Sequence, residues 1–175
     1  MNYLSQHPTV CIRYLGSSVD LHVYSDSDWG SDKDTRRSTS GVLIMMAGGP
    51  VLDVEVQPIV TVSSMEAEYL ACFFAIQDIV WIRQLLKDIN LERSRPTKGY
   101  IDNQSARQLA MNPVHHQRSK HIDIKYHWIR DKVAAQEIEL VHVPTTEQRA
   151  DFLTKTLPAD VFWRHAVAIM HAIYT

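Results

Sequence analysis

Four carboxylates stand where the sequence predicts that strands end or helices begin. Asp26 closes the alternating segment VDLHVYSD, and Asp102 closes the short apolar segment GYID. Glu66 lies near the start of the amphipathic segment VSSMEAEYLACFFAI, and Asp151 lies in TTEQRADFLTKTL. Four carboxylates at one edge of a sheet would repel each other unless a cation neutralised them. Hard oxygen ligands select Mg²⁺ or Mn²⁺, and two such ions can drive phosphodiester hydrolysis.

Glu66 also has a structural interpretation. Ser63 and Glu66 have the spacing of a capping box, in which each side chain satisfies a free backbone N–H at the start of a helix. On the predicted helix, Glu66 shares the core-facing stripe with Tyr69 and Leu70, and Glu68 is expected to point away. A pure cap would tolerate glutamine at position 66, whereas a metal ligand would not.

The three aspartates have structural alternatives as well. Asp26 could cap a turn, Asp102 could cap the helix that follows it, and Asp151 could lie on a solvated helix face. Four such coincidences at the ends of elements are less credible than one shared site. We therefore expect the four carboxylates to meet.

The order of the predicted elements indicates how they meet. The segments VDLHVYSD, VLIMMA and VLDVEVQ read as an antiparallel meander, and a long helix follows over about residues 64–89. Strand GYID, helix NQSARQLAM, helix SKHIDIKYHWIRDKVAAQ and strand IELVHV come next, followed by helices that carry Asp151 and then residues after Pro158. This order predicts an α/β fold whose mixed sheet has a three-strand antiparallel meander and then parallel crossover strands, flanked by helices.

Composition excludes several classes of protein. A chain of 175 residues with 45% hydrophobic residues can bury a full core, and a net charge of −2 means that any nucleic-acid surface must be local. Two cysteines far apart in sequence do not suit a disulfide scaffold and favour a reducing compartment. No stretch approaches the length of an apolar membrane span, so we expect a soluble intracellular protein with no membrane partner.

Five segments, taken in order, resemble one known family. YSDSDWGSDKDTRRSTSG, VSSMEAEYLA, IDNQSARQLAMNP, RSKHIDIKYHWIRD and VPTTEQRADFLTKTLP are together similar to the ribonuclease H domain that ends the Pol polyprotein of copia-type LTR retrotransposons. The resemblance implies a ribonuclease H-like fold over residues 19–158. It also implies that residues 1–18 are a remnant of the connection to reverse transcriptase, and it leaves residues 159–175 as a C-terminal helical extension.

The same resemblance implies an activity and its residues. Asp26, Glu66, Asp102 and Asp151 occupy the positions of the family's catalytic and metal-binding acids, which hold two Mg²⁺ ions, with Mn²⁺ as an alternative. The implied reaction cuts the RNA strand of an RNA/DNA hybrid and leaves a 3′-hydroxyl and a 5′-phosphate. The implied partner besides the hybrid is the reverse transcriptase of the parent polyprotein. The implied location is the cytoplasm, with virus-like particles or the nucleus as alternatives.

Candidate substrate contacts lie next to Asp102 and on the helix of residues 118–133. That helix carries a basic and aromatic stripe suited to phosphate contacts and stacking, although a solvated face with Trp128 packed inward explains the pattern equally well. The strand VLDVEVQ places Asp53 and Glu55 where the family commonly has positive charge, which favours the alternative of a non-catalytic interaction module. The candidate substrate-binding residues are Asn103, Gln104, Arg118, Lys120, His121 and Lys125.

Overall fold

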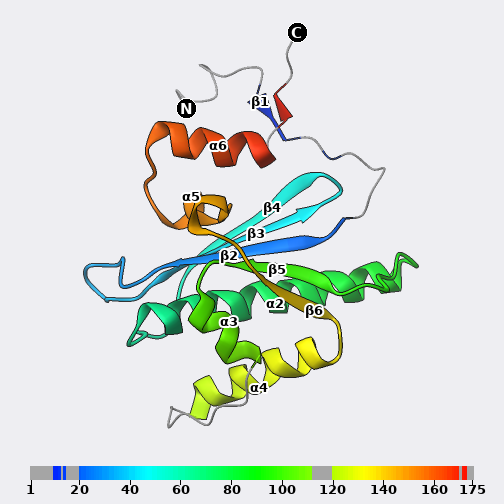
Figure 1. Ribbon diagram of the computed structural model, residues 1–175, viewed down its shortest axis with the longest axis horizontal. Helices are drawn as coiled ribbons and strands as arrows, with labels where there is room; N and C mark the ends of the chain where they lie inside the picture. Colours follow the sequence, from blue (N-terminus) through cyan, green and yellow to red (C-terminus); the bar gives the residue numbers. More distant parts are fainter. Residues whose placement is uncertain (1–9, 13, 15–19, 112–119, 170, 173–175) are drawn as a thin grey trace.

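A five-stranded mixed sheet forms the centre of the protein (Figure 1). The computed structural model describes residues 10–12, 14, 20–111, 120–169 and 171–172. Across the sheet the strand order is β4-β3-β2-β5-β6. The strands are β2 (His22–Asp28), β3 (Thr39–Met46), β4 (Gly49–Val56), β5 (Thr97–Ile101) and β6 (Ile138–His142).

The pairing of these strands confirms the predicted topology. Strands β2, β3 and β4 form an antiparallel meander, and β5 and β6 join β2 in parallel. Each parallel crossover passes through helices, as parallel pairing requires. The carboxyl ends of the central strands β2 and β5 therefore meet at one edge of the sheet.

Helices cover both faces of the sheet (Figure 1). Helices α2, α3 and α4 lie on one face, and α5 and α6 lie on the other. A 3₁₀ turn, η1, comes before α5. These elements are α2 (Ser64–Asp88), α3 (Gln104–Met111), α4 (Lys120–Ala134), η1 (Thr145–Glu147), α5 (Asp151–Thr154) and α6 (Ala159–Ile169).

Helix α2 carries the main core. Its buried side includes Ile76 and Ile79, which cluster with Val23, Val42 and Ile44 from the facing strands. Within the described ranges, α2 is the one helix whose length and mean hydropathy of 1.3 would allow it to cross a membrane, contrary to the expectation from sequence. Half of the most apolar stretch of α2 is buried inside the protein, as is typical of the core helix of a globular fold.

A second, smaller core lies on the opposite face of the sheet. It joins Leu43 and Met45 of β3 to Ala150 before α5 and Ile169 at the end of α6. Beyond α6, strand β7 (His171–Ala172) pairs antiparallel with β1 (Val10–Cys11), so segments from both ends of the chain lie side by side. The expected ends of the ribonuclease H-like domain, after residue 18 and at residue 158, stay predictions.

The region around Asp151 differs from the sequence-based expectation. One continuous helix was expected from Thr145 through Asp151, but the structure has the short turn η1 and then the four-residue helix α5, which begins at Asp151. The reason lies in Gln148, which is fully buried. Its Nε2 donates to the carbonyl of Ser25 at 2.9 Å, and this bond ties the segment to β2 where a regular helix would continue.

Candidate active site

Asp26 and Asp102 face each other because of the parallel register of β2 and β5. Tyr24 pairs with Tyr100 in that register, and their rings stack with centroids 4.7 Å apart. Two residues further along, side chains return to the same face of a sheet. Asp26 near the end of β2 and Asp102 just after β5 therefore lie side by side.

Asp151 reaches this pair because α5 packs unusually close to β3. Gly41 of β3 is the register partner of Asp26. A Cβ atom at Gly41 would lie 2.8 Å from Thr154 Cγ2 and 2.9 Å from Leu153 Cβ, both on α5. The missing side chain at Gly41 is what allows α5 to approach β2 and place Asp151 beside Asp26.

Three carboxylates form the resulting cluster. Asp26, Asp102 and Asp151 each offer an oxygen, and these oxygens lie within 4.8 Å of one another. Asp26 is fully buried and Asp151 nearly so, whereas Asp102 is half-buried. Such a group, one face of which opens to solvent at Asp102, can hold a hard divalent cation.

Neighbouring side chains hold the aspartates in place. Thr154 Oγ1 donates to Asp26 Oδ2. Thr145 Oγ1 donates to Asp102 Oδ2 at 2.9 Å, and His142 Nε2 donates to the Asp102 carbonyl at 3.0 Å. His142 ends β6, as expected from sequence, and its contact with Asp102 is to the backbone.

Lys155 supplies positive charge to the cluster. Its Nζ lies 3.0 Å from Asp26 Oδ1 and 2.9 Å from Asp151 Oδ1. Burial raises the pKa of Asp26 to about 7, although Lys155 and the Thr154 hydroxyl oppose the shift. Carboxylates that cost this much to ionise are ready to be neutralised by a cation.

Glu68 is the fourth carboxylate at the site. Its Oε1 accepts a hydrogen bond from the backbone N–H of Ser27 in β2 at 3.3 Å, and its Oε2 is buried with no hydrogen-bond partner in the described part of the chain. Burial, together with the charges of Asp26 and Asp102, raises the pKa of Glu68 to about 9. An unpartnered buried carboxylate oxygen next to two aspartates is a ready ligand for a metal ion.

Glu66 does not join the cluster, contrary to the expectation from sequence. Its Oε2 accepts from the Val62 backbone N–H at 2.7 Å, while its own N–H donates to Ser63 Oγ at 3.2 Å. These are the bonds of an N-terminal cap, shifted by one residue from the usual capping box. The expectation that Glu68 points away from the core was also wrong, because Glu68 is 9% exposed and faces β2.

Helical spacing contained the signal that identifies Glu68. Glu68, Cys72, Ala75 and Ile79 recur at i, i+4, i+7 and i+11, and all four are buried. The stripe through Glu66 continues with Tyr69, Leu70, Phe73 and Ile76, of which only Phe73 is partly exposed, so both carboxylates begin apolar stripes. Lys155 and Thr154 were also missed, because no periodicity indicated that α5 begins at Asp151.

The predicted substrate-binding residues are spread over two regions. Asn103 caps α3, since its Oδ1 accepts from the Ala106 N–H at 2.9 Å, and Gln104 is exposed at the first turn of that helix. Both follow Asp102 directly, so they flank the cluster. Arg118 lies outside the described residues, and for Lys120 and His121 only the backbone in α4 is described.

Helix α4 packs its aromatic side against α2. Trp128 contacts Phe73 with ring centroids 5.3 Å apart, and Lys125 Nζ lies 5.0 Å from the centroid of Phe73. Trp128 is partly buried against the main core, as the packing interpretation expected. Lys125 therefore sits on an aromatic surface, half-exposed and available to a charged partner.

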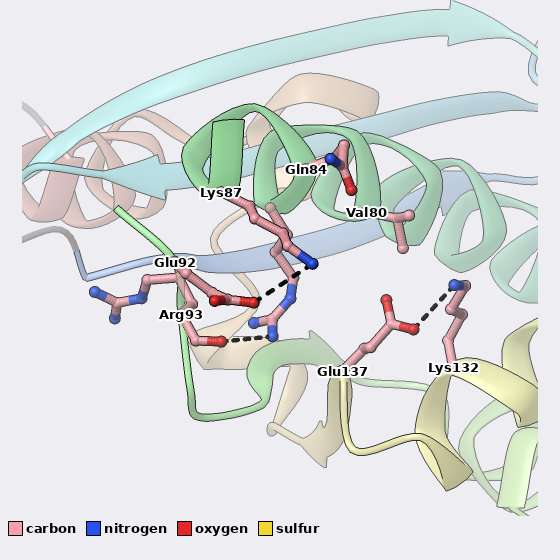
Figure 2. Close-up of a pocket in the computed structure, with 8 residues that line it drawn as sticks. Val80, Gln84, Lys87, Glu92, Arg93, Lys132 and Glu137 are labelled. Carbon is pink, nitrogen blue, oxygen red and sulfur yellow. Dashed lines mark hydrogen bonds and ion pairs between the residues drawn. The ribbon is translucent and has the colours of Figure 1, made fainter. Parts of the chain in front are cut away.

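Two of the described cavities lie away from the aspartates. One cavity of about 320 Å³ lies at the far end of α2 between Val80, Arg83 and Lys87 and the start of β6 (Figure 2). Its charges are paired, Lys87 with Glu92 and Lys132 with Glu137. Arg83 donates to the Arg93 carbonyl, so these side chains act as a structural clamp on the loop before β5.

Comparison with known proteins places the chain among transposon proteins. No protein-family model matches it. It is 34% identical over 163 residues to the retrovirus-related Pol polyprotein from transposon TNT 1-94 of Nicotiana tabacum, covering 93% of this chain and 12% of that polyprotein. It is 40% identical over 155 residues to the Pol polyprotein from transposon RE1 of Arabidopsis thaliana, covering 88% of this chain and 11% of the relative. The chain thus spans only about an eighth of these relatives.

Solved structures share its fold. LC11 ribonuclease H1 in complex with an RNA/DNA hybrid aligns with a TM-score of 0.53 and 19% identity over 76% of this chain and 92% of that one. The N-terminal ribonuclease H domain of Rv2228c from Mycobacterium tuberculosis gives 0.53 and 17%, covering 85% and 97%. The foamy viral protease-reverse transcriptase bound to an RNA/DNA hybrid gives 0.51 and 16%, covering 83% of this chain and 20% of that one.

Proposed function

The chain belongs with the Pol polyproteins of copia-type transposons, and we propose that it cuts the RNA strand of RNA/DNA hybrids with divalent metal ions. It matches one segment of these polyproteins and has a ribonuclease H fold. The proposed products are a 3′-hydroxyl and a 5′-phosphate. The parent polyprotein supplies the proposed partner, a reverse transcriptase. The proposed location is intracellular.

One observation carries the proposal. Carboxylate oxygens of Asp26, Asp102 and Asp151 gather within 4.8 Å of one another, from three separate elements of the chain. This arrangement makes the ionised form of Asp26 unfavourable, because burial raises its pKa to about 7. Clustered acids with a raised pKa are typical of functional sites.

The donor set fits Mg²⁺ or Mn²⁺. Asp26, Asp102 and Asp151 are the proposed ligands. Glu68 takes the fourth position in place of Glu66, because its Oε2 is buried without a hydrogen-bond partner among the described residues and its carboxylate interacts with the charges of Asp26 and Asp102. Bound ions would activate a water molecule and stabilise the departing oxygen of the phosphodiester. The chain's own part is to fix these carboxylates through Thr145, Thr154 and the Ser27 N–H.

The proposed substrate surface runs from the cluster towards α4. Gln104 is exposed at the N-terminus of α3 directly after Asp102, where backbone N–H groups favour phosphate. Lys125 adds a cation on the aromatic surface of Phe73 and Phe74. Arg118, Lys120 and His121 stay predictions for the same surface.

Cleavage of a labelled RNA/DNA hybrid tests the proposal. The chain is assayed in Mg²⁺, Mn²⁺ and chelator, with duplex DNA and duplex RNA as controls, and compared with Asp102→Asn. We expect metal-dependent cutting of the hybrid alone and its loss in Asp102→Asn, which is nearly isosteric but removes one charge from the cluster. A fully active Asp102→Asn protein would overturn the mechanism.

One observation favours a non-catalytic interaction module instead. Asp53 and Glu55 are exposed on the edge strand β4, and Glu55 interacts electrostatically with Lys125. This acidic edge weakens the positive surface that a hybrid needs. Hybrid binding without cleavage, in both the wild type and Asp102→Asn and with any of the metals, would support the interaction module.

A further inference from the structure

Lys155 bridges two of the clustered carboxylates. It follows α5 directly, where the backbone becomes extended. Its Nζ lies 3.0 Å from Asp26 Oδ1 and 2.9 Å from Asp151 Oδ1, so one ammonium group bridges both acids. Among the described residues, Asp26 and Asp151 form ion pairs with Lys155 alone.

The bridge has an asymmetry in burial. The Asp26 side chain is fully buried and that of Asp151 is 9% exposed, whereas the Lys155 side chain is 36% exposed. The acids are therefore fixed, while the lysine enters the site from the solvent side on a flexible four-carbon stem. A lysine can leave such a position by rotating its own side chain, without moving the backbone.

The ammonium and a metal ion would compete for the same atoms. A Mg²⁺ ion held by Asp26 and Asp151 would need carboxylate oxygens that now accept from Lys155, because hard cations bind such oxygens directly, at about 2.1 Å. The Lys155 Nζ lies about 3 Å from those oxygens. Both cations would then be near neighbours in a buried setting, where like charges repel strongly.

We propose that Lys155 is a displaceable counter-ion, which neutralises Asp26 and Asp151 while the site holds no metal and is expelled when a divalent cation binds. This inference rests on the proposed function, in which the same carboxylates are metal ligands. The lysine keeps the metal-free protein folded by preventing two buried carboxylates from standing unpaired. It also lowers the apparent metal affinity, because only the fraction of molecules with the lysine swung out can bind.

A merely structural ion pair makes a different prediction. If Lys155 only stabilised the fold, its removal would lower stability and leave metal affinity unchanged. If it oriented Asp151 for the metal, its removal would weaken metal binding. Displacement alone predicts that the variant is less stable without metal and yet binds metal more tightly.

Calorimetric titration of Mg²⁺ and Mn²⁺ into the metal-free chain separates these cases. The variants are Lys155→Met and, as a matched control, Lys98→Met, since Lys98 is exposed on β5 and makes no contact with the cluster. We expect Lys155→Met to melt at a lower temperature in chelator and to bind Mn²⁺ about tenfold more tightly, which corresponds to a site that is free of the lysine about a tenth of the time in the wild type. Lys98→Met should match the wild type.

Unchanged or weaker Mn²⁺ affinity in Lys155→Met would overturn the inference and leave the proposed function standing. No metal binding in any of the three proteins would overturn both. Amine labelling of the wild type covers the case in which Lys155→Met fails to fold. With Ca²⁺ as the divalent cation, Lys155 should be labelled several-fold faster than in chelator. Lys98 should be labelled at the same rate with Ca²⁺ and in chelator. Equal labelling of Lys155 in both conditions would also overturn the inference.

Discussion

At the scale of single residues, Glu66 and Glu68 divide two tasks that the sequence presents together. They lie two positions apart on α2, so their side chains differ by about 200° around the helix axis. Glu66 turns back to the Val62 N–H and caps the helix, and Glu68 turns to the Ser27 N–H beside the aspartates. One helix start thereby supplies both its own cap and a carboxylate for the site.

Glutamine substitutions separate the two tasks. We expect Glu68→Gln to lower hybrid cleavage by about 100-fold or more, because an amide is a poor metal ligand. Glu66→Gln should keep nearly full activity, since its amide oxygen can still accept from Val62. Initial rates at saturating Mg²⁺ measure both. Loss of activity in Glu66→Gln with Glu68→Gln unaffected would restore the assignment made from sequence.

The raised pKa values of Glu68 and Asp26 predict how stability depends on pH without metal. Both carboxyls bind protons more tightly in the folded than in the unfolded chain, whose carboxyls titrate near pH 4. The folded state therefore holds more protons between about pH 4 and the raised pKa values of about 7 and 9, so stability falls as pH rises through this window. Lys155 is charged throughout the window and contributes no slope.

Denaturant unfolding in chelator at pH 5 and pH 8 measures this slope. We expect the free energy of unfolding of the wild type to fall between the two values. Glu68→Gln should fall less and be more stable than the wild type at pH 8 by about 1 to 3 kcal/mol. The Glu66→Gln control should keep the wild-type slope. A wild-type protein more stable at pH 8 than at pH 5 would contradict the buried, proton-binding state of these acids.

At the scale of elements, the packing of α5 against β3 decides whether Asp151 reaches the site. Gly41→Ala would place a Cβ 2.9 Å from Leu153 Cβ, and a Cβ atom cannot move without its backbone. We expect a loss of about 1 to 3 kcal/mol in stability and a marked loss of cleavage, because α5 shifts away from Asp26. Urea unfolding and the hybrid assay measure the two effects.

Gly99→Ala is the matched control for this packing. It makes the same change on β5, which is separated from β3 by β2, and the new Cβ would meet the flexible end of Leu140 at 3.2 Å. We expect a smaller loss of stability and unchanged cleavage per folded molecule. If Gly41→Ala behaved like Gly99→Ala, close packing of α5 would not be what positions Asp151.

Elements with strong periodicity were predictable, and short elements held by single contacts were not. The meander, α2 and the parallel strands follow from alternation and helical spacing, which also located three of the acids at the ends of elements. Helix α5 has only four residues and depends on buried Gln148 binding β2, a contact between residues 123 positions apart. Glu66 was preferred to Glu68 because a local cap and a core stripe overlap at the start of α2, and the position of Ser27 is set by the tertiary fold.

At the scale of the whole molecule, the sheet is stabilised by two cores of unequal size. The main core under α2 is continuous, whereas the second core depends on apolar side chains from α5 and α6 that pack against Leu43 and Met45. Ile169 at the end of α6 is part of that second core. The segment after residue 158 therefore covers the face of the sheet on which Asp26 and α5 lie, and the two are energetically linked.

Truncation of one side chain tests that link. Ile169 is 2% exposed, so Ile169→Ala should cost about 2 to 4 kcal/mol of unfolding free energy, measured in urea. Val167 on the same helix is 60% exposed, and Val167→Ala should cost less than about 0.5 kcal/mol. If the second core holds α5 in place, Ile169→Ala should also weaken Mn²⁺ binding under conditions where the protein stays folded, because Asp151 loses its support. Equal, small effects of the two substitutions would show that α6 is an appendage, and the sheet with α5 would then form the site without it.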